Sequence, residues 1–230
     1  MFIRKDNTLK WKWIGVGALI TVVLVLACVF GLDKIIHSLI RSEQCMYPSW
    51  ESIDSGWFCT VAKIFAVIFS AKTWLAGTLL AVLIFFVTKA IKNENDFRYA
   101  FVKIKNSYAF YVFLSVLMAT VVTGLLKFLI GRSRPIMYEA LNQTFFVPGT
   151  MEYVFNSMPS GHVAISFAGL VMIGMLYPRI KWATWTLAIL IGFSRIYVGA
   201  HWAGDVIFGA FIGMLCADFA RALLKKINAR

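Results

Sequence analysis

Residues 108–126 read YAFYVFLSVLMATVVTGLL, an apolar run of 19 residues without a charged side chain, followed directly by Lys127. About 20 consecutive apolar residues suffice for an α-helix to cross the hydrocarbon core of a bilayer. Lipid offers the backbone no hydrogen-bonding partner, so a segment that crosses it must satisfy its own N–H and C=O groups, as a helix does. We therefore interpret Tyr108–Leu126 as a transmembrane helix.

The same pattern occurs in five further segments: Trp13–Leu32, Thr73–Thr88, His162–Leu176, Trp182–Val198 and Val206–Phe219. Two of these, Thr73–Thr88 and His162–Leu176, are short for a crossing. Residues 61–71 either lend turns to the segment Thr73–Thr88 or form a separate helix at the membrane interface. The sequence predicts an all-α fold, a single domain over residues 1–230 that is an integral membrane bundle of six transmembrane helices.

The first apolar segment needs an argument of its own, because a basic start followed by an apolar run is also typical of a signal peptide. Leu26-Ala27-Cys28 resembles a lipoprotein cleavage box. However, the apolar run continues past Cys28 to Leu32, which makes it long enough to cross the bilayer. We predict a retained membrane anchor.

Composition and charge favour a membrane protein over a nucleic-acid-binding protein. Hydrophobic residues make up 60% of the chain and its mean hydropathy is +0.76, more apolar than soluble domains. The net charge is +12, but Lys and Arg occupy short segments between apolar runs and form no single stripe. With both termini in the cytoplasm, 15 of the 23 Lys and Arg residues lie on the inner side, as the positive-inside rule requires.

The four cysteines fall into two pairs. Cys28 and Cys216 lie inside apolar runs, where cysteine commonly serves as a packing residue. Cys45 and Cys59 flank a polar stretch that this topology places outside the cytoplasm. In an oxidising compartment they would form a disulfide, and the alternative is a pair of free thiols.

Three polar clusters interrupt the apolar pattern at the predicted outer ends of the spans. The first is KFLIGRSRP at Lys127–Pro135, the second is PSGH at Pro159–His162, and the third is SRIYVGAHWAGD at Ser194–Asp205. Ionisable residues at membrane depth are costly and usually have a function. We expect the three clusters to meet in one pocket beneath the outer surface.

The first hypothesis for this pocket is that it binds phosphate. Lys127, Arg134 and Arg195 are three cations whose proximity would be unfavourable without an anion, and arginine can hold two phosphate oxygens at once. Ser160 and Gly161 precede a helix, so their backbone N–H groups can point at the same anion.

The second hypothesis is that two histidines carry out a phosphoryl transfer. His201 and Asp205 are four residues apart and would share one helical face if the helix began by His201. A carboxylate bound to one imidazole nitrogen leaves the other free as a nucleophile. His162 would protonate the leaving alkoxide and then activate water to release phosphate from a phosphohistidine. The cations and backbone dipoles carry the transition-state charge, so we expect no metal and no other cofactor.

The three clusters resemble the signature of the type 2 phosphatidic acid phosphatase superfamily, Lys-x6-Arg-Pro, Pro-Ser-Gly-His and Ser-Arg-x5-His-x3-Asp, and all signature positions match. The resemblance implies a metal-independent phosphohydrolase with His201 as nucleophile, Asp205 as its partner and His162 as acid. It implies Lys127, Arg134, Ser160, Gly161 and Arg195 as phosphate ligands. The superfamily includes vanadate-binding haloperoxidases, so the resemblance also suggests vanadate as an inhibitor.

We therefore predict a lipid phosphatase in a bacterial inner membrane, with both termini cytoplasmic and the active site on the periplasmic side. Its predicted partners are the bilayer and a membrane lipid phosphate, not nucleic acid, and the sequence does not define an oligomeric state. Candidate substrates are lipid A 1-phosphate, phosphatidylglycerol phosphate, undecaprenyl diphosphate and phosphatidic acid. Two alternatives remain: a lipid phosphotransferase with the same phosphohistidine, and a non-enzymatic anion or lipid transporter.

Some neighbouring residues have simpler explanations. Arg132 is interpreted as a contact to lipid headgroups. Trp202 and Tyr197 flank the predicted site residues, and we interpret both as interfacial anchors, with substrate contact as the alternative.

Overall fold

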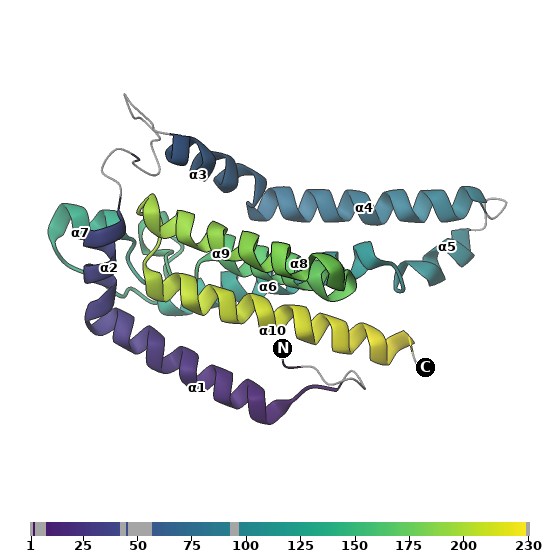
Figure 1. Cartoon of the computed structure of the whole chain (residues 1–230), viewed down its shortest axis with the longest axis horizontal. Coiled ribbons are helices and arrows are strands. Elements are labelled where there is room, and N and C mark those ends of the chain that lie inside the picture. The colour runs from purple at the N-terminus through teal and green to yellow at the C-terminus, as the bar shows by residue number, and fades with distance from the viewer. Residues whose placement is uncertain (1, 3–7, 42–44, 46–56, 93–96, 229–230) are drawn as a thin grey trace.

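The computed structural model describes residues 2, 8–41, 45, 57–92 and 97–228, and no β-strand occurs among them. The chain forms helices α1 (Trp11–Ala27), α2 (Asp33–Ile40), α3 (Trp57–Ile68), α4 (Ala71–Lys92), α5 (Phe97–Ile104), α6 (Tyr108–Ile130), α7 (Pro135–Leu141), α8 (Gly161–Leu176), α9 (Lys181–Tyr197) and α10 (Ala203–Asn228). A π-helical turn, η1 (Cys28–Leu32), joins α1 to α2, and the 3-10 turns η2 (Tyr153–Phe155) and η3 (Pro178–Ile180) lie in loops. Figure 1 shows the long helices running side by side.

The predicted all-α membrane fold is confirmed. Four helical stretches are long and apolar enough to cross a bilayer: Trp11–Ile40, Ala71–Lys92, Tyr108–Ile130 and Ala203–Ile227. The other two predicted spans correspond to α8 and α9, which have only 16 and 17 residues. At about 1.5 Å per residue, such helices fall short of a bilayer core of about 30 Å, so the count of six stays a prediction.

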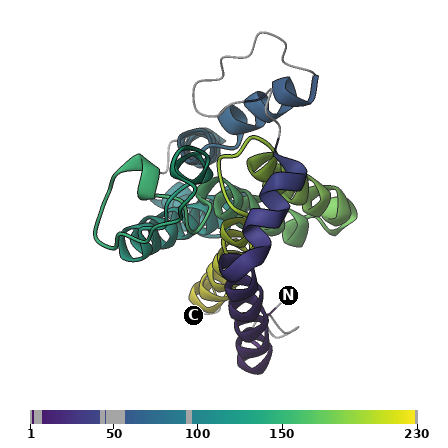
Figure 2. The ribbon, with the colours of Figure 1, turned by 90° about the vertical axis from the view of Figure 1, so that its left-hand side faces the viewer.

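The segment before the second span is a separate helix. Helix α3 ends at Ile68 and α4 begins at Ala71, and Figure 2 shows α3 at the edge of the bundle opposite α1. Of the two alternatives for residues 61–71, the structure therefore has the separate helix. The second span itself, Ala71–Lys92, is longer than the predicted Thr73–Thr88.

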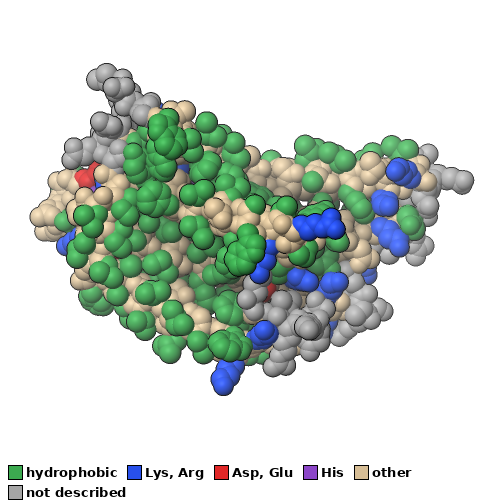
Figure 3. Space-filling view, viewed as in Figure 1, with side chains coloured by type: hydrophobic (Ala, Val, Ile, Leu, Met, Phe, Trp, Pro, Cys, Tyr) green, Lys and Arg blue, Asp and Glu red, His purple; other side chains and the backbone are tan. Residues whose placement is uncertain are grey.

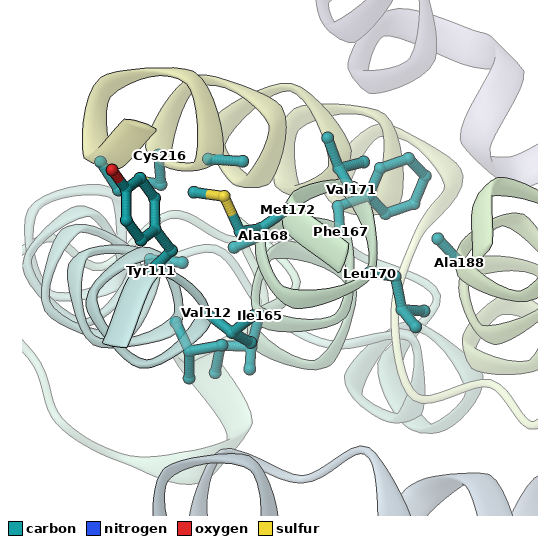
Figure 4. Packing of buried hydrophobic residues seen from close by; sticks show 14 of the residues in the cluster. Tyr111, Val112, Ile165, Phe167, Ala168, Leu170, Val171, Met172, Ala188 and Cys216 are labelled. Atoms are coloured by element: carbon teal, nitrogen blue, oxygen red, sulfur yellow. The ribbon is translucent and has the colours of Figure 1, made fainter. Parts of the chain in front are cut away.

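Helix α8 forms the centre of the bundle. Residues such as Val163, Ala168 and Val171 have no exposed surface, because α6, α9 and α10 pack around them. Figure 4 shows Phe167 and Val171 of α8 facing α10, while Leu170 faces Ala188 of α9. The close packing depends on small residues, as is usual between membrane helices.

Helix α1 packs against α10 along the opposite edge of the bundle from α3 (Figure 1). The backbone N–H of Phe2 donates to Oδ2 of Asp218, 2.8 Å away, and Asp218 is fully buried on α10. The Phe2 ring contacts the Phe211 ring with centroids 6.0 Å apart. Phe2 is therefore tied to α10 through a partly buried hydrogen bond.

The two ends of the bundle differ in charge. Figure 3 shows Lys and Arg side chains gathered on the right half of the visible face, around the ends of α4, α5 and α10. The loops that carry the three predicted motifs lie at the other end, near α2 and α7 (Figure 1). The distribution of cations thus separates the site end from a strongly basic end.

Candidate active site

The three sequence clusters lie at one end of the bundle. The first runs from the last turn of α6 to the start of α7, the second begins α8, and the third runs from α9 through a loop into α10. Gly131 ends α6 in the left-handed conformation, with φ of 59°, and a Cβ here would collide with the backbone of Val147. This turn directs residues 132–134 into the protein, where all three are buried.

Lys127 and Arg134 point to the same place. Nζ of Lys127 donates to the carbonyl oxygen of Asn156 at 2.6 Å, and Nη2 of Arg134 donates to the same oxygen at 3.1 Å. Nη1 of Arg134 donates to the carbonyl of Ala200 at 2.8 Å, and its Nε donates to Tyr153. Arg134 therefore links the loop before α8 to the residue that precedes His201.

The start of α8 faces the same cations. Ser160 is the N-cap residue of α8 and is fully buried, and its backbone N–H donates to the carbonyl of Asp205 at 3.0 Å. Its Oγ is buried and has no hydrogen-bond partner among the described residues. A Cβ on Gly161 would lie 3.6 Å from Cε of Lys127. The positive end of the α8 dipole thus lies next to Lys127.

His162 and Arg195 are both bound to α3. Nε2 of His162 lies 3.1 Å from the carbonyl oxygen of Ala66, and Nη2 of Arg195 donates to the carbonyl of Ala62 at 2.7 Å. Arg195, Arg134 and Lys127 all lie within electrostatic range of the His162 ring. All three predicted cations and His162 therefore gather around one position.

Of the two alternatives left open for Cys45 and Cys59, the structure has the disulfide and not the pair of free thiols. Both sulfurs are buried, and with Ala62, Val198 and Ala200 they form a small apolar cluster beside the site. The polar stretch between the two cysteines lies largely outside the described residues. The bond attaches the first turn of α3 to the segment that comes after α2.

His201 and Asp205 are neighbours, but the predicted geometry was wrong. Helix α10 begins at Ala203, so His201 lies in the preceding loop and the two residues share no helical face. Asp205 instead folds back over the helix start, where its Oδ2 accepts the backbone N–H of Trp202 at 3.0 Å. Nδ1 of His201 lies 3.6 Å from this same oxygen. Such distances are often long in structures without substrate and shorten in the reacting complex.

Ser157 is a site residue that the sequence analysis did not find. Its Oγ donates to Oδ2 of Asp205 at 2.5 Å and lies 3.5 Å from Nδ1 of His201. The side chain is fully buried. A serine two residues before Pro159 carries no distinctive sequence signal, so only the fold reveals that it completes the contacts of this oxygen.

Burial is the main cause of a pKa of His201 well below the ordinary value. The positive charges of Arg134 and Lys127 lower this pKa further, while Asp205 opposes the shift. The imidazole is therefore neutral at physiological pH, which is the form that can act as a nucleophile.

The sequence analysis expected Arg132 to contact lipid headgroups, and this expectation was wrong. Its side chain is 2% exposed and lies between two carboxylates, with Nη1 2.8 Å from Oδ1 of Asp205 and Nη2 2.6 Å from Oδ2 of Asp33. Burial alone would lower the pKa of Arg132, but Asp205 and Asp33 outweigh it and the pKa is raised. The expectation rested on the position of Arg132 near a helix end. It did not consider that the fold brings two carboxylates within reach of this side chain.

Trp202 is also not an interfacial anchor. It is 1% exposed, and its Nε1–H donates to the carbonyl of Ser133 at 2.9 Å. The guanidinium carbon of Arg132 lies 5.4 Å from the centre of the Trp202 ring, within the range of a cation–π contact. Trp202 therefore packs inside the site and holds Arg132 from one face.

The structure is thus an all-helical membrane bundle in which a buried His–Asp pair, three cations and a helix N-terminus lie at one end. The chain belongs to the PAP2 superfamily, whose family model matches residues 108–229, more than half of the sequence.

Known relatives agree with this assignment. The chain is 37% identical over 116 residues to a lipid A 1-phosphatase of Rhizobium johnstonii, covering 48% of each chain. It is 33% identical over 102 residues to an undecaprenyl-diphosphatase of Sulfolobus acidocaldarius, covering 44% of this chain and 47% of the relative. The matches thus span about half the length of these proteins.

A solved structure shares the whole fold. A transmembrane PAP2-type phosphatidylglycerolphosphate phosphatase from Bacillus subtilis aligns with a TM-score of 0.57 at 20% identity. The alignment covers 94% of this chain and 96% of that one. At this identity the likeness supports the fold alone.

Proposed function

We propose that this protein is a metal-independent lipid phosphatase that hydrolyses a phosphate monoester or diphosphate of a membrane lipid. One observation carries the proposal: Lys127, Arg134 and the start of α8 gather beside the buried imidazole of His201, which is adjacent to a carboxylate. A tetrahedral anion bound by these donors would have its phosphorus next to His201. The names of the two sequence relatives, a lipid A 1-phosphatase and an undecaprenyl-diphosphatase, support the same reaction.

The phosphate ligands in this proposal are Lys127, Arg134, Ser160, Gly161 and Arg195. Arg134 has five N–H groups and donates three hydrogen bonds to carbonyls, so it retains donors for phosphate oxygens. The buried Oγ of Ser160 supplies a further donor. Together with the α8 dipole, these groups stabilise the charge that develops on the phosphoryl oxygens in the transition state.

In the proposed reaction Nε2 of His201 attacks phosphorus while the bond from phosphorus to the leaving oxygen breaks. His162 gives a proton to that oxygen, which leaves as an alcohol or a lipid monophosphate. Asp205 holds the proton on Nδ1 of His201 and stabilises the positive ring. A water molecule then attacks the phosphohistidine, His162 takes its proton, and inorganic phosphate leaves as the P–N bond breaks.

The deciding experiment is phosphate release by the purified protein in detergent. The panel contains lipid A 1-phosphate, phosphatidylglycerol phosphate, undecaprenyl diphosphate and phosphatidic acid. We expect release from at least one of these lipids and a loss on the order of 10⁴-fold or more in His201→Ala. Lys226→Ala, at the basic end of α10, serves as the control. No release from any of the four lipids would contradict the proposal.

Two controls test the mechanism. Labelled phosphate should accumulate on His201 in a His162→Ala background, because the release step then lacks its base. Activity should persist in a chelator. If activity were lost and a divalent cation restored it, the metal-free reaction would be contradicted.

Two results would bear on the alternative functions. Release of phosphate without a lipid acceptor argues against the phosphotransferase, and retained function in His201→Ala would favour a transporter.

We also propose that the protein lies in a bacterial inner membrane with both termini in the cytoplasm and the site facing the periplasm. The basic end of the bundle supports this orientation through the positive-inside rule. The disulfide between Cys45 and Cys59 lies at the site end, and such bonds persist in oxidising compartments.

Single cysteines test the orientation. Met151 is 75% exposed in the loop before α8, so a Met151→Cys variant should react with a membrane-impermeant thiol reagent in intact cells. Lys226→Cys should react only after the membrane is permeabilised. The reverse pattern would overturn the orientation.

A further inference from the structure

Arg132 bridges two carboxylates from distant parts of the chain. Asp205 belongs to the first turn of α10, and Asp33 is the first residue of α2, 99 positions before Arg132. The three side chains are 2%, 0% and 3% exposed for Arg132, Asp205 and Asp33 respectively. Burying three charges is costly unless each is paired and hydrogen-bonded, so their relative positions are tightly constrained.

The two oxygens of Asp205 have different partners. Oδ1 accepts from Nη1 of Arg132, while Oδ2 accepts from Ser157 and Trp202 and faces Nδ1 of His201. Because a carboxylate is planar, fixing Oδ1 on Arg132 determines where Oδ2 points. The guanidinium of Arg132 thereby controls the direction of the contact between Asp205 and His201.

Asp33 in turn fixes Arg132. Its Oδ2 accepts from Nη2 of Arg132, and its Oδ1 accepts the backbone N–H of Gly204 at 2.9 Å in the first turn of α10. A Cβ at Gly204 would lie only 3.0 Å from Cβ of Cys28 and 3.2 Å from Oδ2 of Asp33, so a larger residue would require these neighbours to shift. Asp33 closes the turn between α1 and α2, residues 28–33, here called the α1–α2 turn, and therefore ties it to both Arg132 and the start of α10.

We propose that Arg132 and Asp33 are positioning residues for the nucleophile: they orient the Asp205 carboxylate so that it holds His201 in the tautomer with the proton on Nδ1 and Nε2 free. The inference rests on the proposed function. It assigns a role in the reaction to the α1–α2 turn, which lies outside the three motifs and outside the segment 108–229. Neither residue is among the proposed phosphate ligands, and Arg132 contacts Asp205 directly, so both act through Asp205.

The charges of the three residues predict the effect of each substitution. Arg132→Met leaves Asp33 and Asp205 as two buried carboxylates without their shared cation. Asp205 is then free to rotate or to take up a proton, and His201 loses the acceptor that selects its tautomer. Asp33→Asn is milder, because the amide keeps the volume of the side chain while Arg132 retains its contact to Asp205.

The test is steady-state kinetics per mole of folded protein. Loss of partners that orient a catalytic group commonly costs about 10–100-fold, so we expect kcat to fall by about 100-fold in Arg132→Met and about 10-fold in Asp33→Asn. KM should stay within about threefold, because the phosphate ligands remain. Arg132→Lys should recover part of the lost rate, and Arg179→Met, an exposed arginine in the α8–α9 turn, should behave as wild type.

A second readout does not require turnover. The chain has three histidines, so ¹⁵N-histidine spectra can be assigned with single His→Gln variants. We expect His201 as the Nδ1–H tautomer in the wild type and as a mixture in Arg132→Met, with His37 and His162 little changed. Asp33→Asn and Arg132→Lys provide the same test if Arg132→Met does not fold.

The outcomes separate the two proposals. If the wild type releases no phosphate but the tautomer depends on Arg132, the proposed function fails and the positioning role stands. If the wild type is active while a folded Arg132→Met keeps both its kcat and the His201 tautomer, the positioning role is overturned. A loss of stability with unchanged kcat per folded molecule would also overturn it, because it would mark a purely structural ion pair.

Discussion

Nε2 of His162 lies 3.1 Å from the carbonyl oxygen of Ala66, so the first turn of α8 is attached to α3. One helical turn earlier, the carbonyl of Ala62 accepts a hydrogen bond from Arg195. Helix α3 thus contacts two of the proposed site residues through its backbone. The disulfide between Cys45 and Cys59 holds the first turn of this helix in place.

Removing the disulfide should loosen this attachment. A cross-link that closes a loop of about 15 residues contributes about 3 kcal/mol, so Cys45→Ala/Cys59→Ala should unfold at a lower temperature and show reduced kcat/KM. The measurement compares thermal unfolding and phosphate release with and without reductant. Reductant should lower the unfolding temperature and kcat/KM of the wild type and leave those of the variant unchanged. Equal sensitivity of both proteins to reductant would contradict the role of the disulfide.

Arg134→Lys should impair phosphate binding although it keeps the charge. A lysine ammonium cannot reproduce the planar fork that contacts Tyr153, Ala200 and Asn156 and still donates to phosphate. We expect kcat/KM to fall by about 10–100-fold and the inhibition constant for vanadate to rise in parallel. Lys226→Ala is again the matched control, and an unchanged vanadate constant in Arg134→Lys would contradict the role of Arg134.

His201 should remain neutral in mildly acidic solution. Burial, followed by the charges of Arg134 and Lys127, lowers its pKa well below the ordinary value of 6.5, and Asp205 opposes this shift only in part. An ¹⁵N-histidine titration should therefore show no protonation of His201 near pH 6.5. A midpoint at the ordinary value would mean that the ring is more solvated or closer to Asp205 than in the structure.

Glu139 should make stability depend on acid. Its carboxylate accepts hydrogen bonds from His37 at 3.1 Å and from Arg41 at 2.8 Å. These bonds lower the pKa of Glu139 from 4.5 to about 2, and the bond from His37 has the larger influence. Because the folded-state pKa is below the unfolded value, this stabilisation is complete above pH 4.5 and is lost as the pH falls towards 2. In Glu139→Gln the thermal unfolding midpoint should depend less on pH over this range. An unaltered pH dependence would contradict the role of Glu139.

Gly209→Ala should disturb the start of α8. A Cβ at this position on α10 would lie 2.7 Å from the carbonyl oxygen of Ser160, a backbone atom that cannot move without shifting the proposed phosphate ligands Ser160 and Gly161. We expect lower stability and lower activity. Gly124→Ala is the matched control, because Gly124 is exposed on α6 and has no atom within 4 Å of its Cβ position. Equal behaviour of the two variants would count against this packing argument.

Much of the fold was predictable because apolar length is a strong local signal. Tyr108–Leu126 was predicted as a span, and α6 contains it. The ends of helices were less predictable, since α10 begins at Ala203 and leaves His201 in a loop. That boundary depends on Asp205 accepting the Trp202 N–H, a contact that the sequence pattern alone does not reveal.

The candidate site was predictable where its residues form spaced motifs. Arg132 and Asp33 were not assigned to it, because an arginine near a helix end is ordinarily a headgroup contact and because Asp33 lies in a distant segment. The available clue was that Asp33 directly follows an apolar run, where an acidic residue is costly without a partner. Pairing it with Arg132 required the three-dimensional arrangement.

The bond from Asp33 to the backbone of Gly204 has a practical meaning for protein engineering. A chimera that exchanged residues 1–107 for the corresponding part of another superfamily member would keep every motif, yet it would replace the acid that meets Arg132. Designers who transplant this catalytic half should carry the α1–α2 turn with it, or supply an equivalent carboxylate at that position.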